Sequence, residues 1–291
     1  MNRPKVNLIS LGCSKNLVDS EKILASVTNK GGIVCENSEN ADVIVINTCG
    51  FINSAKEESI DSILQIADLK EHGKCKKLIV TGCLAQRYKS ELQKEIPEID
   101  HVIGLNKFDK IADKIFFKRN GLSHKTAKSP DNDVSLKTSA KLIEDKKSLP
   151  LVNSRQGSSF NKRISLTPKH YAYLKISEGC NNRCTYCTIP SIRGRYKSRP
   201  IEEILIEAQS LAANGVKEIN IIAQDTTAYG YDLYKEQKLH TLLKKISEIK
   251  SVKWIRLLYT HPARIYNELI DEIAFNKKIC NYIDMPIQHI N

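Results

Sequence analysis

The chain has no apolar run long enough to span a bilayer, and its N-terminus has no apolar segment of signal-peptide length. The longest apolar runs, at 43–46 and 219–223, are as long as strands, whereas a membrane helix needs about 20 apolar residues. These absences exclude a membrane-spanning protein and a secretory leader. We therefore expect a cytoplasmic protein that has no membrane partner.

Aromatic residues make up only 6% of the chain, and the segment 118–169 is nearly free of them. This segment also lacks the regular apolar spacing seen elsewhere and is rich in Ser, Lys, Asp and Asn. It carries 12 basic and 4 acidic side chains, which accounts for most of the net charge of +12. We predict a basic irregular linker. Such a linker either contacts RNA or the ribosome electrostatically or is a solvated, lysine-rich loop.

Strand and helix patterns alternate before this linker. Strands joined by helices of this length form parallel sheets with covered faces. The fold class is therefore α/β, with an N-terminal open parallel α/β sheet domain at 1–117. The predicted strands are 6–12, 32–36, 41–48, 76–82 and 101–105, and the predicted helices are 16–29, 54–70, 85–96 and 108–117.

Residues 170–291 continue the alternation with four strands, the last of which is not followed by a helix. Four βα units are too few to close a barrel, so we expect a partial (β/α) barrel, truncated at residue 291. The strand near 281–285 should be an unpaired edge. The side chains of Ile255, Leu257 and Ile283 should be exposed on the uncovered inner face.

Cysteine, in contrast, is abundant. Nine cysteines in a cytoplasmic chain indicate metal or redox chemistry rather than disulfides. Cys180, Cys184 and Cys187 follow a strand with the spacing C-x3-C-x2-C. Three thiolates on one loop can bind a single iron–sulfur cluster and leave one iron open. The alternative is a structural zinc site, which needs a fourth Cys or His, and none lies in the loop.

An open iron can chelate the amino and carboxylate groups of S-adenosylmethionine. One electron from the cluster then breaks the sulfonium C–S bond and gives a 5′-deoxyadenosyl radical. The loop, with the aromatic Tyr186 before its last cysteine, resembles that of the radical S-adenosylmethionine superfamily. This resemblance implies that Gln224 and Asp225, which follow the strand 217–223, contact the cofactor. The alternative for Asp225 is that it caps the following turn.

A second set of cysteines occupies equivalent positions in the first domain. Cys13, Cys49 and Cys83 each stand at the carboxyl end of a predicted strand and just before a helix. The carboxyl ends of parallel strands converge on one edge of a sheet, where helix N-termini favour negative charge. We predict a second three-thiolate cluster there. The alternative is three buried thiols at strand ends.

Two such cysteine sets in one chain are the arrangement of the methylthiotransferase family. The segments SLGCSKNLVDSE, INTCGFINSAKEESID, TGCLAQRY and AQDTTAYG resemble that family closely, and the resemblance covers 5–117 and 170–291. It implies a radical-generating [4Fe–4S] cluster in the second domain and an auxiliary [4Fe–4S] cluster in the first. It also implies further barrel strands and a C-terminal TRAM domain, which are absent from this chain.

Two short motifs indicate the branch of the family. Ser14–Lys15 stands where the transfer RNA branch tends to carry Gln–Met, and Gln224–Asp225 follows Ala223 where that branch tends to read Gly-Gln-Asn. The resemblance therefore implies insertion of a methylthio group at the β-carbon of an aspartate in uS12 of the small ribosomal subunit, with flavodoxin or ferredoxin as electron donor. The alternatives are methylthiolation of transfer RNA adenosine and an inactive iron–sulfur fragment that binds RNA.

Several basic residues beside the predicted clusters have roles that the sequence leaves open. Arg193, Arg195 and Arg199 follow the cysteine loop and either meet the substrate or cofactor or are solvated. His261 precedes a proline at a strand end, and we expect a structural role for it.

Overall fold

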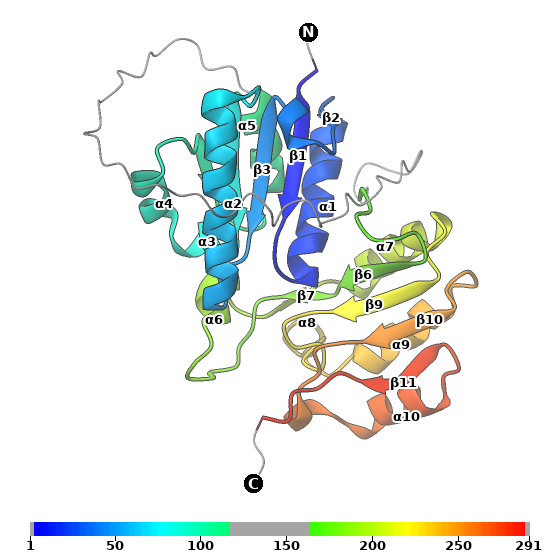
Figure 1. The fold of residues 1–291 in the computed structure, drawn as a ribbon. Coiled ribbons are helices and arrows are strands. Elements are labelled where there is room, and N and C mark those ends of the chain that lie inside the picture. The colour runs from blue at the N-terminus through cyan, green and yellow to red at the C-terminus, as the bar shows by residue number, and fades with distance from the viewer. Residues whose placement is uncertain (1–2, 117–162, 289–291) are drawn as a thin grey trace.

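The computed structural model describes residues 3–116 and 163–288 (Figure 1). They form two α/β units, each built on a parallel sheet. The predicted linker lies outside the described residues except for its last seven positions. Within the two described ranges, no helix has both the length and the apolar character needed to cross a membrane.

The first sheet has five parallel strands in the order β2-β1-β3-β4-β5. Its central strand, β3, is buried at every position, as expected for a strand covered on both faces. The sequence predicted all five strands. They are β1 (Lys5–Ser10), β2 (Ile33–Val34), β3 (Val43–Thr48), β4 (Lys77–Gly82) and β5 (His101–Ile103).

Helices cover both faces of this sheet. Val43 and Val45 pack with α1 and α5, whereas Ile44 and Ile46 point to the opposite face and pack with α2, α3 and α4. This alternation is the period of a strand and gives a three-layer unit. The helices are α1 (Ser14–Asn29), α2 (Asn53–His72), α3 (Cys83–Arg87), α4 (Lys89–Glu95) and α5 (Phe108–Phe116), with a short 3-10 helix, η1 (Ser38–Asn40).

Two details of the first unit differ from the sequence prediction. The helix expected at 85–96 is divided between α3 and α4 at Tyr88, whose backbone leaves the helical conformation. On α2, Ile60 and Leu64 are exposed, whereas Ile63 and Ile66 are buried. The apolar spacing in 54–70 predicts one apolar face made of Ile60, Ile63, Leu64 and Ala67, of which Ile63 and Ala67 are buried and the other two are not.

The second sheet has four parallel strands in the order β11-β10-β9-β6. Helices α7, α9 and α10 pack on one face of it and share a single apolar core with the strands. A two-stranded antiparallel ribbon, β7 with β8, precedes α7 and was not predicted. The elements are β6 (Tyr171–Lys175), β7 (Ser177–Glu178), α6 (Ile189–Arg193), β8 (Lys197–Ser198), α7 (Ile201–Ala213), β9 (Glu218–Ile222), α8 (Tyr231–Tyr234), α9 (Leu239–Ser247), β10 (Trp254–Leu257), η2 (Pro262–Arg264), α10 (Asn267–Phe275) and β11 (Ile279–Ile283).

The expected exposure of the inner face is wrong at two of three positions. Ile255 and Leu257 are fully buried in the core beneath the helices, and Trp254 is the exposed residue of β10. The alternation along β10 thus faces the other way, because a shift of one residue exchanges the two faces of a strand. Ile283 is exposed. In the described part of the chain, β11 pairs with β10 alone and forms the expected edge.

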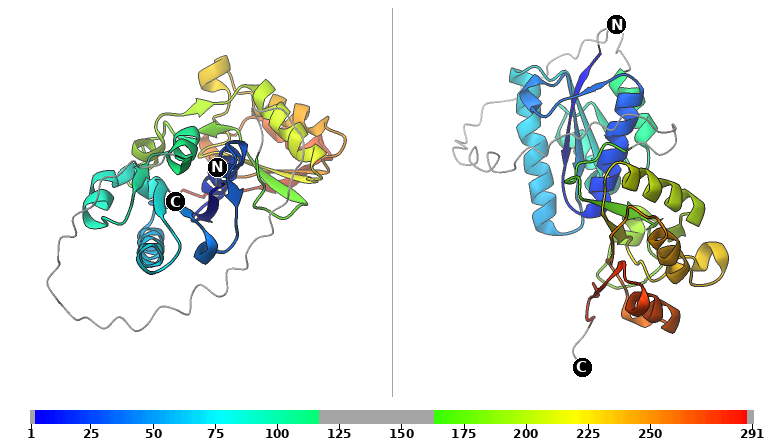
Figure 2. Two further views of the ribbon diagram at one scale, coloured as in Figure 1. Left: turned by 90° about the horizontal axis from the view of Figure 1, so that it is seen from above. Right: turned by 90° about the vertical axis from the view of Figure 1, so that its right-hand side faces the viewer.

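The two units meet at the carboxyl ends of their strands. Helix α1 packs against β6, and α3 packs against α6. In Figure 1 the carboxyl ends of β6, β9, β10 and β11 point toward the side on which α6 lies, below the first sheet, and Figure 2 shows α1 beside the second unit from other directions. Residues placed at strand ends in both units therefore gather in one region.

Candidate functional site

The first cysteine set lies at one edge of the first sheet. Cys13 caps the N-terminus of α1 after β1, Cys49 follows β3, and Cys83 is the first residue of α3 after β4. The strand order reverses between β1 and β3, and in open α/β sheets ligands bind at that switch point. Cys49 and Cys83 are buried, and Cys13 is exposed. The structure therefore brings together the three residues that the sequence singled out.

Glycines allow the three loops to approach closely. Gly12 has a φ of +86°, and a Cβ added to it would lie 2.7 Å from the Cβ of Cys49. Gly82, with a φ of +97°, precedes Cys83, and a Cβ there would fall on the carbonyl oxygen of Thr48. Any larger residue would push the cysteine loops apart.

Burial raises the pKa of the Cys83 thiol to about 11, and the nearby Arg193 guanidinium opposes this rise. The thiols of Cys13 and Cys49 also act on Cys83 electrostatically, so the three lie within interaction range. A thiol must lose its proton to bind a metal. The positive charge of Arg193 favours that deprotonated form.

Arg193 connects the two units. Its guanidinium donates to Glu178 at 2.8 Å and to Asp19 at 3.3 Å, and it also contacts the Cys83 sulfur at 3.5 Å. A fourth bond runs to the side-chain oxygen of Asn16 at 2.6 Å. The side chain is 1% exposed. Burial alone would lower the pKa of Arg193, but the two carboxylates outweigh it and raise the pKa.

The second cysteine set lies on the loop between β7 and α6. Cys180, Cys184 and Cys187 are each half-buried. The amide of Cys180 donates to the carbonyl of Gly194 at 3.1 Å, and the amide of Cys187 donates to the carbonyl of Cys184 at 3.1 Å. Burial raises the pKa of Cys180, and the charges of Cys187 and Cys184 add to the rise. These three thiols are also within interaction range of one another.

The donor sets suit iron–sulfur clusters better than single ions. Among the described residues, no three Cys, His, Asp or Glu side chains surround one point as ligands of a single metal ion would. A cluster takes one thiolate for each iron, so its ligands stand further apart. Each set is composed of soft thiolates alone, which is the ligand type that iron–sulfur clusters use. The residues present therefore fit two clusters.

Asp225 caps a turn, which was the alternative reading of this residue. Its Oδ1 accepts from the Thr227 hydroxyl at 2.6 Å and from the amide of Ala228 at 3.2 Å. Its Oδ2 accepts from Arg264 at 2.8 Å and from Asn182, on the cysteine loop, at 3.4 Å. The carboxylate thus ties this turn to the loop that carries the second cysteine set.

Gln224 points toward the same region. Its side-chain amide donates to Glu178 at 2.9 Å. Its Oε1 is buried and has no hydrogen-bond partner within 3–116 and 163–288. A buried acceptor without a donor costs free energy unless a ligand supplies one.

Arg199, Arg195 and His261, the other residues considered in the sequence analysis, lie in different places. Arg199 pairs with Glu207 at 2.7 Å, and Arg195 is exposed. The Nδ1 of His261 accepts from the amide of Ala263 at 3.3 Å, which is the structural role expected for it.

Sequence reasoning missed the buried ion pairs that hold the units together. Lys175 pairs with Asp19 and Glu178, and Arg163 pairs with Glu21 and Glu207. Arg163 belongs to the segment predicted as an irregular linker, yet it is buried. Lys175 could have indicated these pairs from the sequence. It is a charged residue in an otherwise apolar strand, and a buried charge requires a partner of opposite charge.

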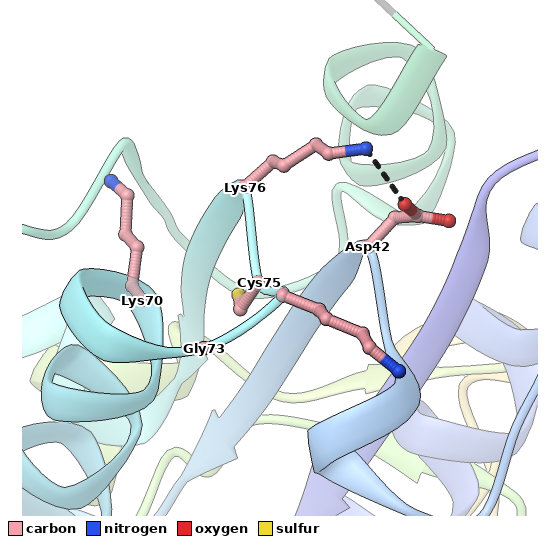
Figure 3. A pocket seen from close by; sticks show the side chains of 6 residues that line it. Asp42, Lys70, Gly73, Cys75 and Lys76 are labelled. Atoms are coloured by element: carbon pink, nitrogen blue, oxygen red, sulfur yellow. Dashed lines mark hydrogen bonds and ion pairs between the residues drawn. The ribbon is translucent and has the colours of Figure 1, made fainter.

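A hollow of about 560 Å³ lies at the opposite edge of the first sheet, beside the amino ends of β3 and β4 (Figure 3). Two of its three lysines are paired with carboxylates, Lys76 with Asp42 at 3.1 Å and Lys70 with Asp100 at 2.6 Å. The third, Lys74, donates to the side-chain oxygen of Asn40 at 3.2 Å. The hollow lies at the opposite ends of β3 and β4 from Cys49 and Cys83.

Comparisons with known proteins agree with this geometry. The family described as uncharacterized protein family UPF0004 matches residues 5–104, and the radical SAM superfamily matches residues 174–291. The fold resembles that of the radical S-adenosylmethionine methyltransferase TsrM from Kitasatospora setae, with a TM-score of 0.59, 13% identity, and coverage of 99% of this chain and 60% of that one. The chain thus belongs to the radical S-adenosylmethionine superfamily, whose members use a [4Fe–4S] cluster and S-adenosylmethionine.

Two curated relatives define the family more closely. The ribosomal protein uS12 methylthiotransferase RimO of Clostridium botulinum (strain Eklund 17B) is 49% identical over 294 residues, and that of Acetivibrio thermocellus is 50% identical over 289 residues. These matches cover 100% and 99% of this chain and 60% of each relative. Within the superfamily, the chain belongs to the methylthiotransferase family of the RimO type, and it spans about 60% of the length of these relatives.

Proposed function

We propose that this chain carries the two cluster-binding units of a methylthiotransferase that acts on ribosomal protein uS12, at the β-carbon of an aspartate. The observation that supports this most strongly is the pair of three-cysteine sets on facing sheet edges, with the buried Arg193 bonded to both loop regions. The relatives that are 48–50% identical to this chain are named as ribosomal protein uS12 methylthiotransferases.

In this proposal Cys180, Cys184 and Cys187 hold the radical-generating cluster, and Cys13, Cys49 and Cys83 hold the auxiliary cluster. When bound, the first supplies the electron for S-adenosylmethionine cleavage and the second supports the methylthio group. Gln224 and Asp225 hold the cofactor: the free Oε1 of Gln224 offers an acceptor, and Asp225 fixes the turn beside the cysteine loop.

The protein's own residues position the reacting groups. Arg193 holds α6 against α3, so the loop that follows Cys187 cannot shift relative to Cys83. Small displacements between reacting groups cost large factors in rate.

The proposal includes a cytoplasmic location and an electron donor of the flavodoxin or ferredoxin type. Tyr186, next to Cys187, is 78% exposed, and the cysteines of this loop are only half-buried. A reduced partner protein could therefore approach the second cysteine set directly from solvent.

Mass spectrometry tests the proposed substrate. The anaerobically reconstituted protein is incubated with S-adenosylmethionine, a reductant, and either uS12 or transfer RNA. We expect the methylthio increment on the uS12 aspartate alone. An increment on transfer RNA adenosine would instead assign the chain to the transfer RNA branch of the family. RNA binding without any increment would favour an inactive RNA-binding fragment.

A further inference from the structure

Lys15 crosses the boundary between the two units. It is the second residue of α1, two positions after Cys13, and it is 7% exposed. Its Nζ lies over the ring of Tyr259 in the second unit, 2.9 Å from the ring centroid. The neighbouring Ser14 hydroxyl lies 3.3 Å from the Tyr259 hydroxyl. Both residues of Ser14–Lys15, one of the two motifs that indicated the branch of the family, therefore contact one tyrosine.

In the part of the chain that the structure describes, no carboxylate forms an ion pair with the ammonium group of Lys15; Cys13, Glu178 and Asp284 act on its charge without a direct contact. Within the described ranges its Nζ makes no hydrogen bond or ion pair, and its contact is the cation–π interaction with Tyr259. The neighbouring buried cations differ, because Lys175 and Arg193 each pair with both Asp19 and Glu178. A buried ammonium without a carboxylate is costly, and a cation–π contact offsets only part of that cost.

Nearby carboxylates are already engaged. Glu178 accepts from Lys175, Arg193 and Gln224. Asp284 accepts from the backbone amide of Tyr259 at 2.9 Å. Glu178 and Asp284 stabilise the charge of Lys15 electrostatically, but neither forms an ion pair with it, so a carboxylate from outside could make that direct pair.

Tyr259 is held in an uncommon backbone conformation. Its φ is +60°, a value that non-glycine residues seldom adopt. Such residues persist where the surroundings fix them, and they cluster at ligand sites. The carbonyl of Tyr259 accepts from the amide of Thr226 at 2.9 Å, next to Asp225. The ring therefore sits between the first cysteine set, reached through Lys15, and the turn proposed to hold S-adenosylmethionine.

We propose that Lys15 binds the side-chain carboxylate of the substrate aspartate, with the Tyr259 ring as the wall of this subsite. The proposal rests on the proposed function, since it names the group that recognises that substrate. Pairing with the ammonium would hold the aspartate β-carbon, one bond from the carboxylate, between the two cysteine sets. It would also select aspartate over its uncharged amide.

The test measures discrimination between aspartate and asparagine. Intact uS12 and a uS12 variant with Asn at the target position are each titrated into the wild-type protein and into Lys15→Met, Lys15→Arg and Lys22→Met, by calorimetry. Lys22 is the matched control because it lies two helical turns along α1, beside Glu207 and Arg199. Equal iron content and equal circular dichroism verify that the variants are folded.

We expect the wild type to prefer the aspartate form by roughly 10- to 100-fold, as a charge-assisted hydrogen bond provides. Lys15→Met should remove this preference, Lys15→Arg should keep part of it, and Lys22→Met should keep all of it. The KM for S-adenosylmethionine in cleavage without substrate should stay unchanged.

Two results would overturn the inference in distinguishable ways. If Lys15→Met keeps the wild-type preference for aspartate, or raises only the KM for S-adenosylmethionine, then Lys15 does not bind the substrate carboxylate while the proposed function stands. If the wild type modifies transfer RNA and neither form of uS12, both the inference and the proposed function are wrong.

Discussion

The two cysteine sets are assembled in different ways. Cys13, Cys49 and Cys83 come from three strand ends that the sheet itself brings together, whereas Cys180, Cys184 and Cys187 come from one loop within eight residues. Two of the first set are buried, and all of the second are half-buried. The first site therefore depends on the folded core, and the second depends on a few hydrogen bonds of its loop.

This difference predicts how each site responds to a mutation that disturbs the packing of the protein. A change in the packing of the first sheet moves three chain segments at once, and the thiols separate. The same change leaves the C-x3-C-x2-C spacing of the second site intact. Arg193 links the two cysteine sites, because it is bonded to Glu178 of the second unit and lies against Cys83 of the first.

The largest expected effect separates the two sets by chemistry. Replacing Cys180, Cys184 and Cys187 by Ala should abolish S-adenosylmethionine cleavage, because the open iron that binds the cofactor is lost. Replacing Cys13, Cys49 and Cys83 by Ala should leave cleavage detectable and abolish methylthiolation. Chromatography of 5′-deoxyadenosine measures the cleavage. Loss of cleavage in both triple variants would show that the two sites are not independent.

Removal of the Arg193 side chain should weaken the boundary between the units. Arg193→Met leaves Asp19 and Glu178 with one cation fewer in a buried place, and breaking a buried ion pair costs about 3–5 kcal/mol. Arg195→Met is the matched control, since Arg195 is exposed two residues away, and should cost less than about 0.5 kcal/mol. Urea denaturation followed by circular dichroism compares the two, and equal losses would refute the role given to Arg193.

Gly82 tests the dependence of the first site on backbone approach. Gly82 and Gly215 share a φ of +97°, but an added Cβ falls on Thr48 backbone at the first and meets nothing within 4 Å at the second. Gly82→Ala should therefore cost about 3 kcal/mol from strain and overlap, and Gly215→Ala about 1 kcal/mol from strain alone. Thermal unfolding measures both. Iron content should fall in Gly82→Ala and stay unchanged in Gly215→Ala.

Acid should weaken the contact between the units to a smaller extent. Burial alone would raise the pKa of Glu207, but Arg163 and Arg199 lower it from 4.5 to about 2. A carboxyl group with a depressed folded-state pKa stabilises the protein above its unfolded pKa, and this stability is lost as the pH falls from about 4.5 toward 2. By pH 3 about 2 kcal/mol should be gone. Glu207→Gln, less stable at pH 7, should show a shallower acid dependence; an unchanged slope would contradict the assignment.

The sequence predicted the architecture because periodicity and cysteine placement are local signals. The strands of both sheets follow from apolar runs, and the strand-end positions of Cys13, Cys49 and Cys83 follow from the same runs. The expected exposure of Ile255 and Leu257 on β10 was wrong, and only half of the apolar face predicted for α2 is buried, because an apolar residue does not reveal which of two faces is covered. Lys15 and Tyr259, 244 positions apart, could not be paired from sequence at all, since only tertiary packing brings them together.

The central claim, two independent three-thiolate cluster sites in one chain, is tested most directly by counting iron and sulfide in the anaerobically reconstituted protein and recording its Mössbauer spectrum. Full occupancy should give about eight irons and about eight sulfides in two four-iron clusters, with about four of each left in either triple cysteine variant. Zinc in place of iron, or a wild-type count of only about four irons with one triple variant unchanged from it, would contradict the claim.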